Sequence, residues 1–208
     1  MFMCTSLLRK IFPLRGIQFG EFVKVQRMSS LTAQAPNATI ELGDNCIVYE
    51  DAKLEAYGTG AIQLGADCII GATKIYSRYS ISIGDRVITS WNVYIQDYDP
   101  HPVEADLRAE QVLQMSRGFL SKNSQAPASA KLAAWNFPGA AITIGSDVWI
   151  GTNVAIMKGA HIGDGCIVGA GAVVLSGDYT PHSLIAGNPA RIVKSIDPLS
   201  TNRLQNKP

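Results

Sequence analysis

Five copies of one short motif constrain the fold of this 208-residue chain more than any other feature. Each copy is a Leu or Ile followed by Gly and then a small or acidic residue, and the copies begin at Leu42, Leu64, Ile83, Ile144 and Ile162. When the copies are superposed, aliphatic residues return every six positions, and the last two copies follow each other at an interval of eighteen residues. Agreement across five copies indicates a structural repeat.

Three further columns of residues line up in the superposed copies. Two positions before the Leu or Ile stand Ile40, Ile62, Ile81, Ile142 and Ala160; six positions after it stand Val48, Ile70, Thr89, Ile150 and Val168; twelve positions after it stand Leu54, Tyr76, Ile95, Ile156 and Val174. A period of six fits neither an amphipathic helix nor an isolated strand. It fits a short strand and a turn of fixed length, repeated three times to close one triangular coil.

Stacked coils explain why the columns are apolar. Equivalent residues then lie above one another at the strand spacing of about 4.8 Å, so each inward column becomes a continuous apolar ladder. A single coil does not bury this face, whereas a stack does. We expect the Gly of each motif to occupy a tight corner that has little room for a Cβ, or that requires a positive φ.

The repeats, of the form [Leu/Ile]-Gly-Asp-x-x-x-[Ile/Val]-Gly, resemble those of the hexapeptide-repeat acyltransferases, among them the polysaccharide and sugar O-acetyltransferases. The resemblance, not the spacing, implies that the helix is left-handed. The expected fold is therefore all-β: a left-handed parallel β-helix of about five coils, forming a triangular prism with an extruded loop and short terminal helices. The expected boundaries are a helical or extended cap over 1–36, the β-helix over 37–196 with an inserted loop at 98–140, and a tail over 197–208.

Composition excludes several classes of function. The net charge is +1 and 17% of the residues are charged, so there is no electrostatic case for binding nucleic acid. No apolar run is long enough to span a membrane. Residues 6–15 mix apolar and basic side chains without the features of a secretory signal; they are interpreted either as a helix that plugs the first coil or as a peripheral contact with an anionic membrane surface.

Three of the four cysteines occupy one column of the repeat. Cys46, Cys68 and Cys166 stand where the other two copies have Val87 and Val148, so we expect them to pack as small buried hydrophobic residues. This use of cysteine is typical of a reducing compartment, and we expect a cytoplasmic protein.

The repeat stops between Gln96 and Ala141, and a loop of that length in a compact domain is usually functional. It leaves after the third coil and returns as the fourth begins, so we expect it to project from one edge of the prism, with a helix over 104–115. His101 lies at its root between two prolines that restrict the backbone. The other two histidines, His161 and His182, are predicted to lie on the solvated surface.

In the acetyltransferase family, a His on a loop after the third coil acts as general base, and Asp99-Pro100-His101-Pro102-Val103 resembles its sequence context. The resemblance implies that His101 removes the proton of an acceptor hydroxyl while its other ring nitrogen is held by an acceptor, for which Asp97, Asp99 and a backbone carbonyl are the candidates. Asn92, Asp97 and Asp99 are the candidate substrate-binding residues.

A second resemblance concerns the segment around Trp149, which is similar to the family segment that lies along the pantetheine arm of acetyl-CoA. It implies a cofactor groove lined by Trp149, Thr152, Ala170, Leu175 and Ser176. The segment Gly187-Asn188-Pro189-Ala190-Arg191 resembles the end of the family's prism, where cations face the CoA phosphates. Arg191 and Lys194 are predicted to lie one helical turn apart there; the alternative is a helical cap with solvated charges.

The leading hypothesis is an acetyl-CoA-dependent O-acetyltransferase that transfers an acetyl group directly to a sugar hydroxyl of a surface polysaccharide or glycolipid precursor. The family resemblance also implies a homotrimer with its sites between subunits. The alternatives are an acetyltransferase for antibiotics or other xenobiotics, and a non-catalytic β-helix scaffold. A γ-class carbonic anhydrase needs three converging histidines, and the three here lack the spacing, so no metal is expected.

Overall fold

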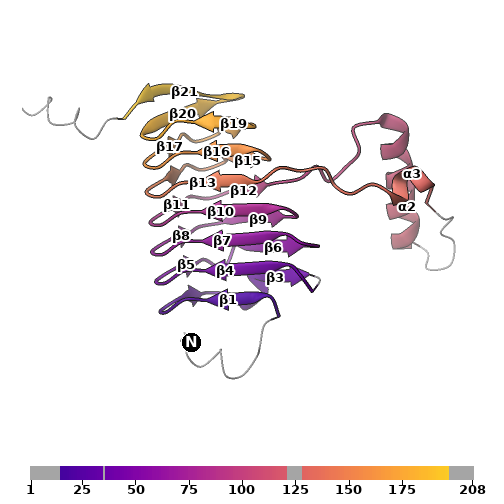
Figure 1. Cartoon of the computed structure of the whole chain (residues 1–208), viewed down its shortest axis with the longest axis horizontal. Helices are drawn as coiled ribbons and strands as arrows, with labels where there is room; N and C mark the ends of the chain where they lie inside the picture. Colours follow the sequence, from indigo (N-terminus) through magenta and orange to yellow (C-terminus); the bar gives the residue numbers. More distant parts are fainter. Residues whose placement is uncertain (1–14, 35, 121–127, 197–208) are drawn as a thin grey trace, which may run out of the picture.

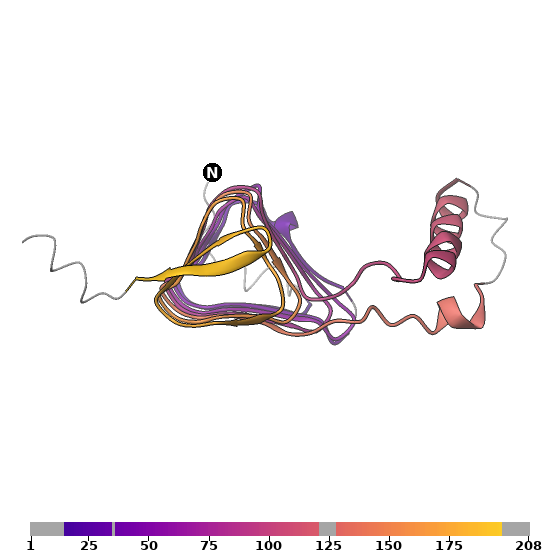
Figure 2. The ribbon, with the colours of Figure 1, turned by 90° about the horizontal axis from the view of Figure 1, so that it is seen from above.

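The computed structural model describes residues 15–34, 36–120 and 128–196. They form a triangular prism from which a long arm projects sideways (Figures 1 and 2). The chain passes through three sheets in turn, and each pass adds one coil to the stack.

The three sheets are the faces of the prism. The first sheet contains β1 (Ile17–Phe19), β4 (Thr39–Leu42), β7 (Ala61–Leu64), β10 (Ser80–Ile83), β13 (Ile142–Ile144), β16 (Ala160–Ile162) and β19 (Gly177–Tyr179). The second contains β2 (Lys24–Val25), β5 (Ile47–Val48), β8 (Ile69–Ile70), β11 (Ile88–Thr89), β14 (Trp149–Ile150), β17 (Ile167–Val168), β20 (Ser183–Gly187) and β21 (Ala190–Ser195). The third contains β3 (Leu31–Gln34), β6 (Lys53–Tyr57), β9 (Thr73–Ser77), β12 (Val93–Gln96), β15 (Ala155–Met157) and β18 (Val173–Val174).

The β-helix begins earlier than the motif indicated. Strands β1, β2 and β3 pair in parallel with the strands of the next coil, so the described residues form six complete coils and part of a seventh, instead of about five. The boundary expected at residue 37 is therefore wrong, because most of 17–34 is an additional coil that lacks the full motif. This coil includes the short 3-10 helix η1 (Met28–Ser30).

The core is the set of inward ladders that the columns predicted. Ile40, Ile62, Ile81 and Ile142 stack in register in the first sheet and have no exposed surface. One column contained an error. Ile75, not Tyr76, pairs with Leu54 and Ile95 and is buried, because the coil of β7, β8 and β9 reaches its inward residue in the third sheet one residue sooner than the coils on either side.

The glycines of the motif allow the coils to approach each other. A Cβ added at Gly43 would lie 2.5 Å from the backbone of Gly65 in the next coil. A positive φ is not the reason for these glycines, since it occurs two positions later, as at Asn45 (φ 59°) and Asp67 (φ 59°). The motif Asp links coils as well: the Oδ1 of Asp85 accepts a hydrogen bond from the backbone N–H of Ala66 in the coil below, at 2.8 Å.

The cysteine prediction is confirmed for Cys46, Cys68 and Cys166, which are free and fully buried. Each thiol lies within hydrogen-bonding distance of a backbone carbonyl, such as Cys46 Sγ and Gly65 O at 3.1 Å. Burial raises the pKa of the Cys166 thiol. These thiols are packing residues of the corner between the first two sheets.

The ends of the prism differ from the helices expected there. The C-terminal end is an antiparallel hairpin of β20 and β21, not a helix. At the other end, residues 1–14 lie outside the described part, and so do most of residues 6–15, which were interpreted as a plug or a membrane contact. No helix within the described ranges is long and apolar enough to cross a membrane.

We expect Gly43→Ala to lower the free energy of unfolding by about 2 to 3 kcal/mol, because the new Cβ overlaps backbone that is fixed by the next coil. Thermal unfolding followed by circular dichroism measures this. The matched control is Gly169→Ala, whose added Cβ would come no closer than 3.3 Å, to the Ala186 Cβ. Equal melting temperatures for the two variants would contradict the proposed role of the motif Gly.

Candidate active site

The arm leaves the prism after β12 and returns to it just before β13, at the edge between the third and first sheets (Figure 2). This confirms that the loop projects from one edge. The helix predicted over 104–115 is α2 (Ala105–Leu120), which packs against the short helix α3 (Ala130–Ala133). α2 and α3 lie well clear of the prism from which the arm departs.

His101 is exposed on the arm, and its ring is held by a residue of α2. The Nδ1 of His101 lies 2.8 Å from the Oε1 of Gln111. The Nε2 of Gln111 in turn donates to the carbonyl oxygen of Pro100 at 3.5 Å, which fixes the amide so that its oxygen faces the imidazole. This geometry places the ring proton of neutral His101 on Nδ1 and leaves Nε2 as a free acceptor.

Gln111 replaces the three acceptors that the sequence suggested for His101. No local pattern indicates it, because the two residues are ten positions apart and meet only when α2 folds back over the loop. The helix predicted directly after His101 was the one signal that a residue of this helix could contact the imidazole. The sequence does not show which face of the helix turns toward His101, so it does not single out Gln111.

Asp97 is not available to a substrate, which corrects its assignment as a substrate-binding residue. Its side chain is fully buried, and its carboxylate accepts hydrogen bonds from the Ser77 hydroxyl (2.7 Å) and from the backbone N–H groups of Arg78 (2.9 Å) and Tyr79 (3.1 Å). Burial raises the pKa of this carboxyl. Asp97 fastens the last strand before the arm to the turn after β9.

Asp99 and Asn92 occupy two different edges of the prism. Asp99 forms an ion pair with Lys158 at the root of the arm, with Oδ2 and Nζ 2.5 Å apart. Asn92 lies at the corner between the second and third sheets, where its backbone has a positive φ of 57° and its amide donates to the Oδ1 of Asn153 in the next coil. The structure therefore does not bring the three candidate substrate-binding residues together.

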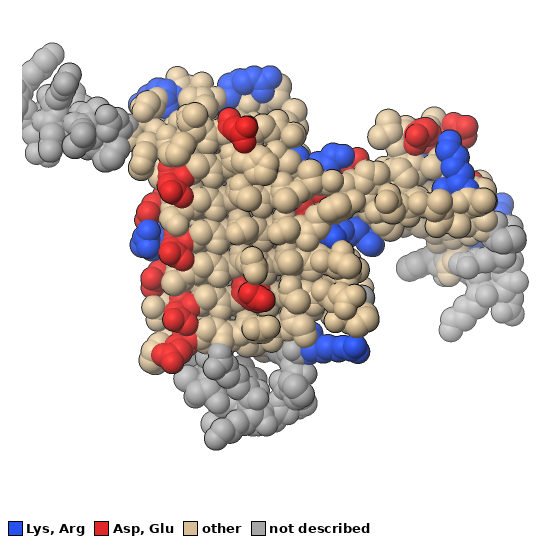
Figure 3. Space-filling model, viewed as in Figure 1, with Lys and Arg blue, Asp and Glu red and all other residues tan. Residues whose placement is uncertain are grey.

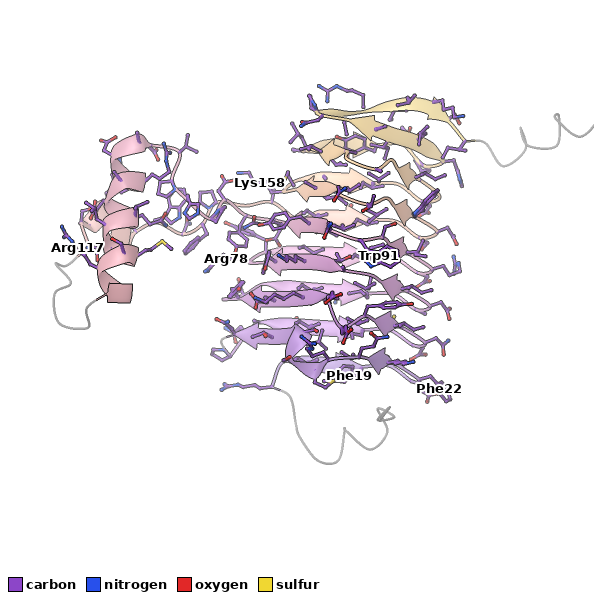
Figure 4. All side chains as sticks on the ribbon, turned by 180° about the vertical axis from the view of Figure 1, so that it is seen from behind. Phe19, Phe22, Arg78, Trp91, Arg117 and Lys158 are labelled. Carbon is purple, nitrogen blue, oxygen red and sulfur yellow. The ribbon has the colours of Figure 1, made fainter. Side chains whose placement is uncertain are left out.

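A recess of about 430 Å³ opens beside Asn92 at the third sheet. It is lined by Asp51, Ala72, Lys74, Trp91, Asn92, Val93 and Tyr94. Trp91 is 65% exposed and lies on the part of the prism away from the arm (Figure 4). Trp91 was not among the residues predicted from the sequence, although the superposed copies place it at the same corner position as Thr152, where a side chain faces outward.

A polar and aromatic cluster covers the third sheet beside the recess. Glu55 is only 8% exposed, accepts a hydrogen bond from the Tyr57 hydroxyl and forms an ion pair with Lys53 at 2.8 Å. Burial, together with the hydrogen bond to Glu55, raises the pKa of the Tyr57 hydroxyl. The rings of Tyr76 and Tyr94 pack with their centroids 5.7 Å apart. This face can offer both ring surfaces and hydrogen-bonding groups to a ligand.

The residues predicted to line the cofactor groove border the upper part of the same sheet. Thr152 and Ala170 stand at its edge with the second sheet; Thr152 donates from its hydroxyl to the backbone oxygen of Trp91 at 2.8 Å. Leu175, which is 43% exposed, and Ser176 follow β18 at the opposite edge. Their contact with a cofactor stays a prediction.

Trp149 is 50% exposed on the second sheet, as its outward position predicted. It belongs to an apolar column, one residue from each successive coil, that runs along the outside of this sheet: Ile47, Ile69, Ile88, Trp149, Ile167 and Leu184. An outward apolar ladder across several coils is typical of an interface.

Arg191 and Lys194 are not one helical turn apart, because β21 is a strand; that expectation is wrong. In the hairpin, Arg191 pairs with Ala186 and Lys194 with Leu184, and the register shifts between Leu184 and Ile185. Directly paired residues of an antiparallel ladder point to the same face. Because of this register shift, Arg191 and Lys194 both lie on the outer face of the second sheet, above the apolar column.

The other two histidines, His161 and His182, are exposed, as predicted, and His161 Nδ1 lies 2.8 Å from the Thr143 hydroxyl.

Acidic side chains gather along the edge between the first and second sheets (Figure 3). Their carboxylates link coils, as Asp147 does through its two hydrogen bonds with Arg86, which lower the pKa of Asp147. In the described ranges, no group of His, Cys, Asp and Glu is arranged to hold a metal ion.

Asp97→Asn is expected to lower the free energy of unfolding by about 1 to 3 kcal/mol, because an amide N–H₂ then faces donors that the carboxylate satisfied. Denaturant unfolding measures this. Asp99→Asn is the control, since the partly exposed ion pair with Lys158 is expected to contribute less than about 1 kcal/mol. A stability loss confined to Asp99→Asn would refute the structural role of Asp97.

Comparison with known proteins supports this architecture. Residues 141–176 match the family described as bacterial transferase hexapeptide (six repeats), and no curated relative matches the chain. Among solved structures, the chain is similar to the N-acyltransferase AntD from Bacillus cereus in complex with dTDP and 3-hydroxybutyryl-CoA. The two are 19% identical, with a TM-score of 0.67 over 98% of this chain and 96% of that one.

A single-residue variant of AntD, in complex with dTDP-4-amino-4,6-dideoxyglucose and coenzyme A, is 17% identical, with a TM-score of 0.61 over 99% of this chain and 98% of that one. A maltose O-acetyltransferase from Clostridium difficile 630 is 25% identical over 93% of this chain and 74% of that one, with a TM-score of 0.45. The chain thus has the left-handed parallel β-helix fold, and its residues 141–176 carry the bacterial transferase hexapeptide repeat.

Proposed function

We propose that this protein is an O-acetyltransferase that moves an acetyl group from acetyl-CoA to a sugar hydroxyl, with His101 as general base. The observation that carries the proposal is the Gln111–His101 contact, which leaves Nε2 of an exposed imidazole free to accept a proton. The fold it shares with AntD, which binds dTDP and an acyl-CoA in its structure, supports the assignment to acyl transfer.

The chemistry needs one base and a well-placed thioester. Nε2 of His101 removes the proton of the acceptor hydroxyl as its oxygen attacks the thioester carbonyl carbon. The tetrahedral intermediate then collapses, the C–S bond breaks, and the imidazolium returns the proton to the leaving CoA sulfur. Throughout, Gln111 Oε1 accepts the hydrogen bond from Nδ1–H and keeps the ring in one orientation.

The recess on the third sheet is the proposed acceptor site. Trp91 offers an exposed ring on which a sugar can stack, and Lys74, Asn92 and Asp51 supply the polar groups that hold hydroxyls or a phosphate. The cofactor is proposed to lie above it, along Thr152, Ala170, Leu175 and Ser176, with Trp149 at the margin and Arg191 and Lys194 near its phosphates. A precursor of a surface polysaccharide or glycolipid is the proposed acceptor.

A sugar amine is the second candidate acceptor. One AntD structure contains dTDP-4-amino-4,6-dideoxyglucose, an amino sugar, together with coenzyme A. An amine also loses a proton as it becomes an amide, so the same imidazole serves either reaction. The two candidates are separated by offering matched hydroxy and amino sugars to the same preparation.

The active unit is proposed to be a homotrimer. His101 lies on the arm, which extends away from its own prism (Figure 2). The recess lies beside Trp91, at the corner between the second and third sheets, and Trp91 lies on the part of the prism away from the arm (Figure 4). A neighbouring subunit is therefore the natural source of the recess that receives each His101. The apolar column of the second sheet supplies a surface that a second copy can cover.

His101→Ala is expected to reduce kcat about 10²- to 10⁴-fold, the range found when a general base is lost. Release of CoA thiol from acetyl-CoA with a panel of sugars measures it. His161→Ala, which removes an exposed imidazole from the first sheet, is expected to keep native activity. Full activity of His101→Ala, or no thiol release by the native protein, would favour the alternatives and rule out this mechanism.

Ile88→Asp is expected to shift the protein from trimer to monomer and to abolish transfer, because it places a charge in the middle of the apolar column. Ile88 is 44% exposed, so the monomer itself tolerates the change. Analytical ultracentrifugation and the thiol assay follow the two effects. Gln63→Lys, at an outward position of the first sheet, is the control. A trimeric Ile88→Asp variant would place the interface elsewhere.

A further inference from the structure

Arg78 contacts both legs of the arm and the prism. Arg78 follows β9, in the turn between the third and first sheets, and its guanidinium carbon lies 3.7 Å from the ring centroid of Phe137, 5.2 Å from that of Tyr98 and 5.3 Å from that of Tyr57. Tyr98 belongs to the outgoing leg of the arm, Phe137 to the returning leg and Tyr57 to the prism. Figure 4 places Arg78 where the arm meets the prism.

The backbone of Arg78 is fixed by the residue that starts the outgoing leg. Its N–H donates to the buried carboxylate of Asp97, which directly precedes Tyr98. The backbone of Arg78 is thus bound to the residue that follows β12, and its guanidinium contacts both legs of the arm. Arg78 therefore links the outgoing leg, the returning leg and the prism through contacts of a single residue.

The guanidinium is held mainly by ring faces. Its Nε is buried and has no hydrogen-bond partner within the described part of the chain. A planar guanidinium can stack on one ring while it attracts the electron-rich faces of others, and the compact ammonium of Lys cannot do so equally well. The chemistry of this site therefore specifies Arg.

The two legs are also fastened to each other. Tyr98 and Gly139 form an antiparallel bridge, and the backbone N–H of Asp99 donates to the Pro138 oxygen at 2.8 Å. Gly139 has no room for a Cβ, which would lie 2.5 Å from the Tyr79 ring. The two legs therefore form one ribbon, whose direction depends on how it is fixed to the prism. Lys158, which follows β15, fixes the outgoing leg through Asp99, whereas Arg78 contacts both legs.

His101 stands two residues beyond Asp99, between Pro100 and Pro102. The ring of a proline fixes its φ angle, so the backbone on both sides of His101 has little freedom. The position of the imidazole therefore follows the direction of the ribbon. Helix α2, which carries Gln111, is attached through the same legs. A rotation at the root would move the base and its partner together, away from the recess that the neighbouring subunit supplies.

We propose that Arg78 is a positioning residue: through the rings of Tyr57, Tyr98 and Phe137 it fixes the direction of the arm and hence the place at which His101 meets the acceptor. The consequence for catalysis rests on the proposed function. The mechanical role of Arg78 does not, and it can be measured separately.

The test is Arg78→Met, which keeps the length and apolar stem of the side chain but removes the planar cation. Hydrogen exchange measured by mass spectrometry is expected to quicken at least fivefold for the amides of 98–104 and 135–140, and to stay unchanged over β13 to β18. In the thiol assay, kcat is expected to fall about tenfold, with the KM for acetyl-CoA within twofold of native, since misplacement of a base acts on the chemical step. Arg78→Lys should give a smaller change in both readouts.

Arg117→Met is the matched control, because Arg117 lies on α2, away from the root (Figure 4), and should leave exchange and kcat as they are. Native exchange at the root of Arg78→Met overturns the proposal, whatever the activity. Faster exchange at the root in an otherwise native fold supports it. If the native protein transfers no acetyl group, the proposed function fails, and the exchange data still decide the role of Arg78. A native kcat alongside faster exchange would refute the link to His101.

Discussion

The structure depends on how closely one coil can lie on the next. At the first corner of each coil the backbones come so near that a single Cβ would overlap the neighbouring chain, as at Gly43 and Gly65. This contact holds the strands in parallel register, so every inward column becomes an unbroken apolar ladder. The same stacking aligns outward residues. The acidic edge, the apolar column of the second sheet and the polar cluster of the third are all products of one repeat distance.

A rigid prism gives the arm a fixed base. The arm interrupts the chain between two coils that still pair in perfect register, β10 with β13 and β12 with β15, so the insertion leaves the stack intact. Its attachment is made by non-local contacts: the buried Asp97, the ring-bound Arg78 and the pair of Asp99 with Lys158. The proposed mechanism requires this division, because a general base that reaches a neighbouring subunit needs both a long arm and a fixed direction.

The sequence predicted the repeating part well and the irregular parts poorly. Alternate burial in a strand is a local property, so the inward columns, the buried cysteines and the outward Trp149 follow from spacing. The error at Tyr76 arose from a corner one residue shorter, which spacing alone does not reveal. Arg191 and Lys194 were assigned to a helix because their interval fits one turn, whereas pairing with β20 makes the segment a strand. Asp97 looked like a site residue because a carboxylate near a loop suggests chemistry, and burial gave it a structural role.

The sequence by itself therefore determined the β-helix, its inner faces and the place where the arm leaves. Each of these follows from the six-residue spacing of apolar residues, or from its interruption, and this spacing is a local property of the chain. The tertiary structure decided which side chains from separate segments contact each other. Gln111 holds His101 because a helix folds back over ten residues, Arg78 touches rings from three separate segments, and Trp91 borders a recess formed by different coils. Such contacts depend on the rotation of elements in space, and no spacing along the chain specifies that rotation.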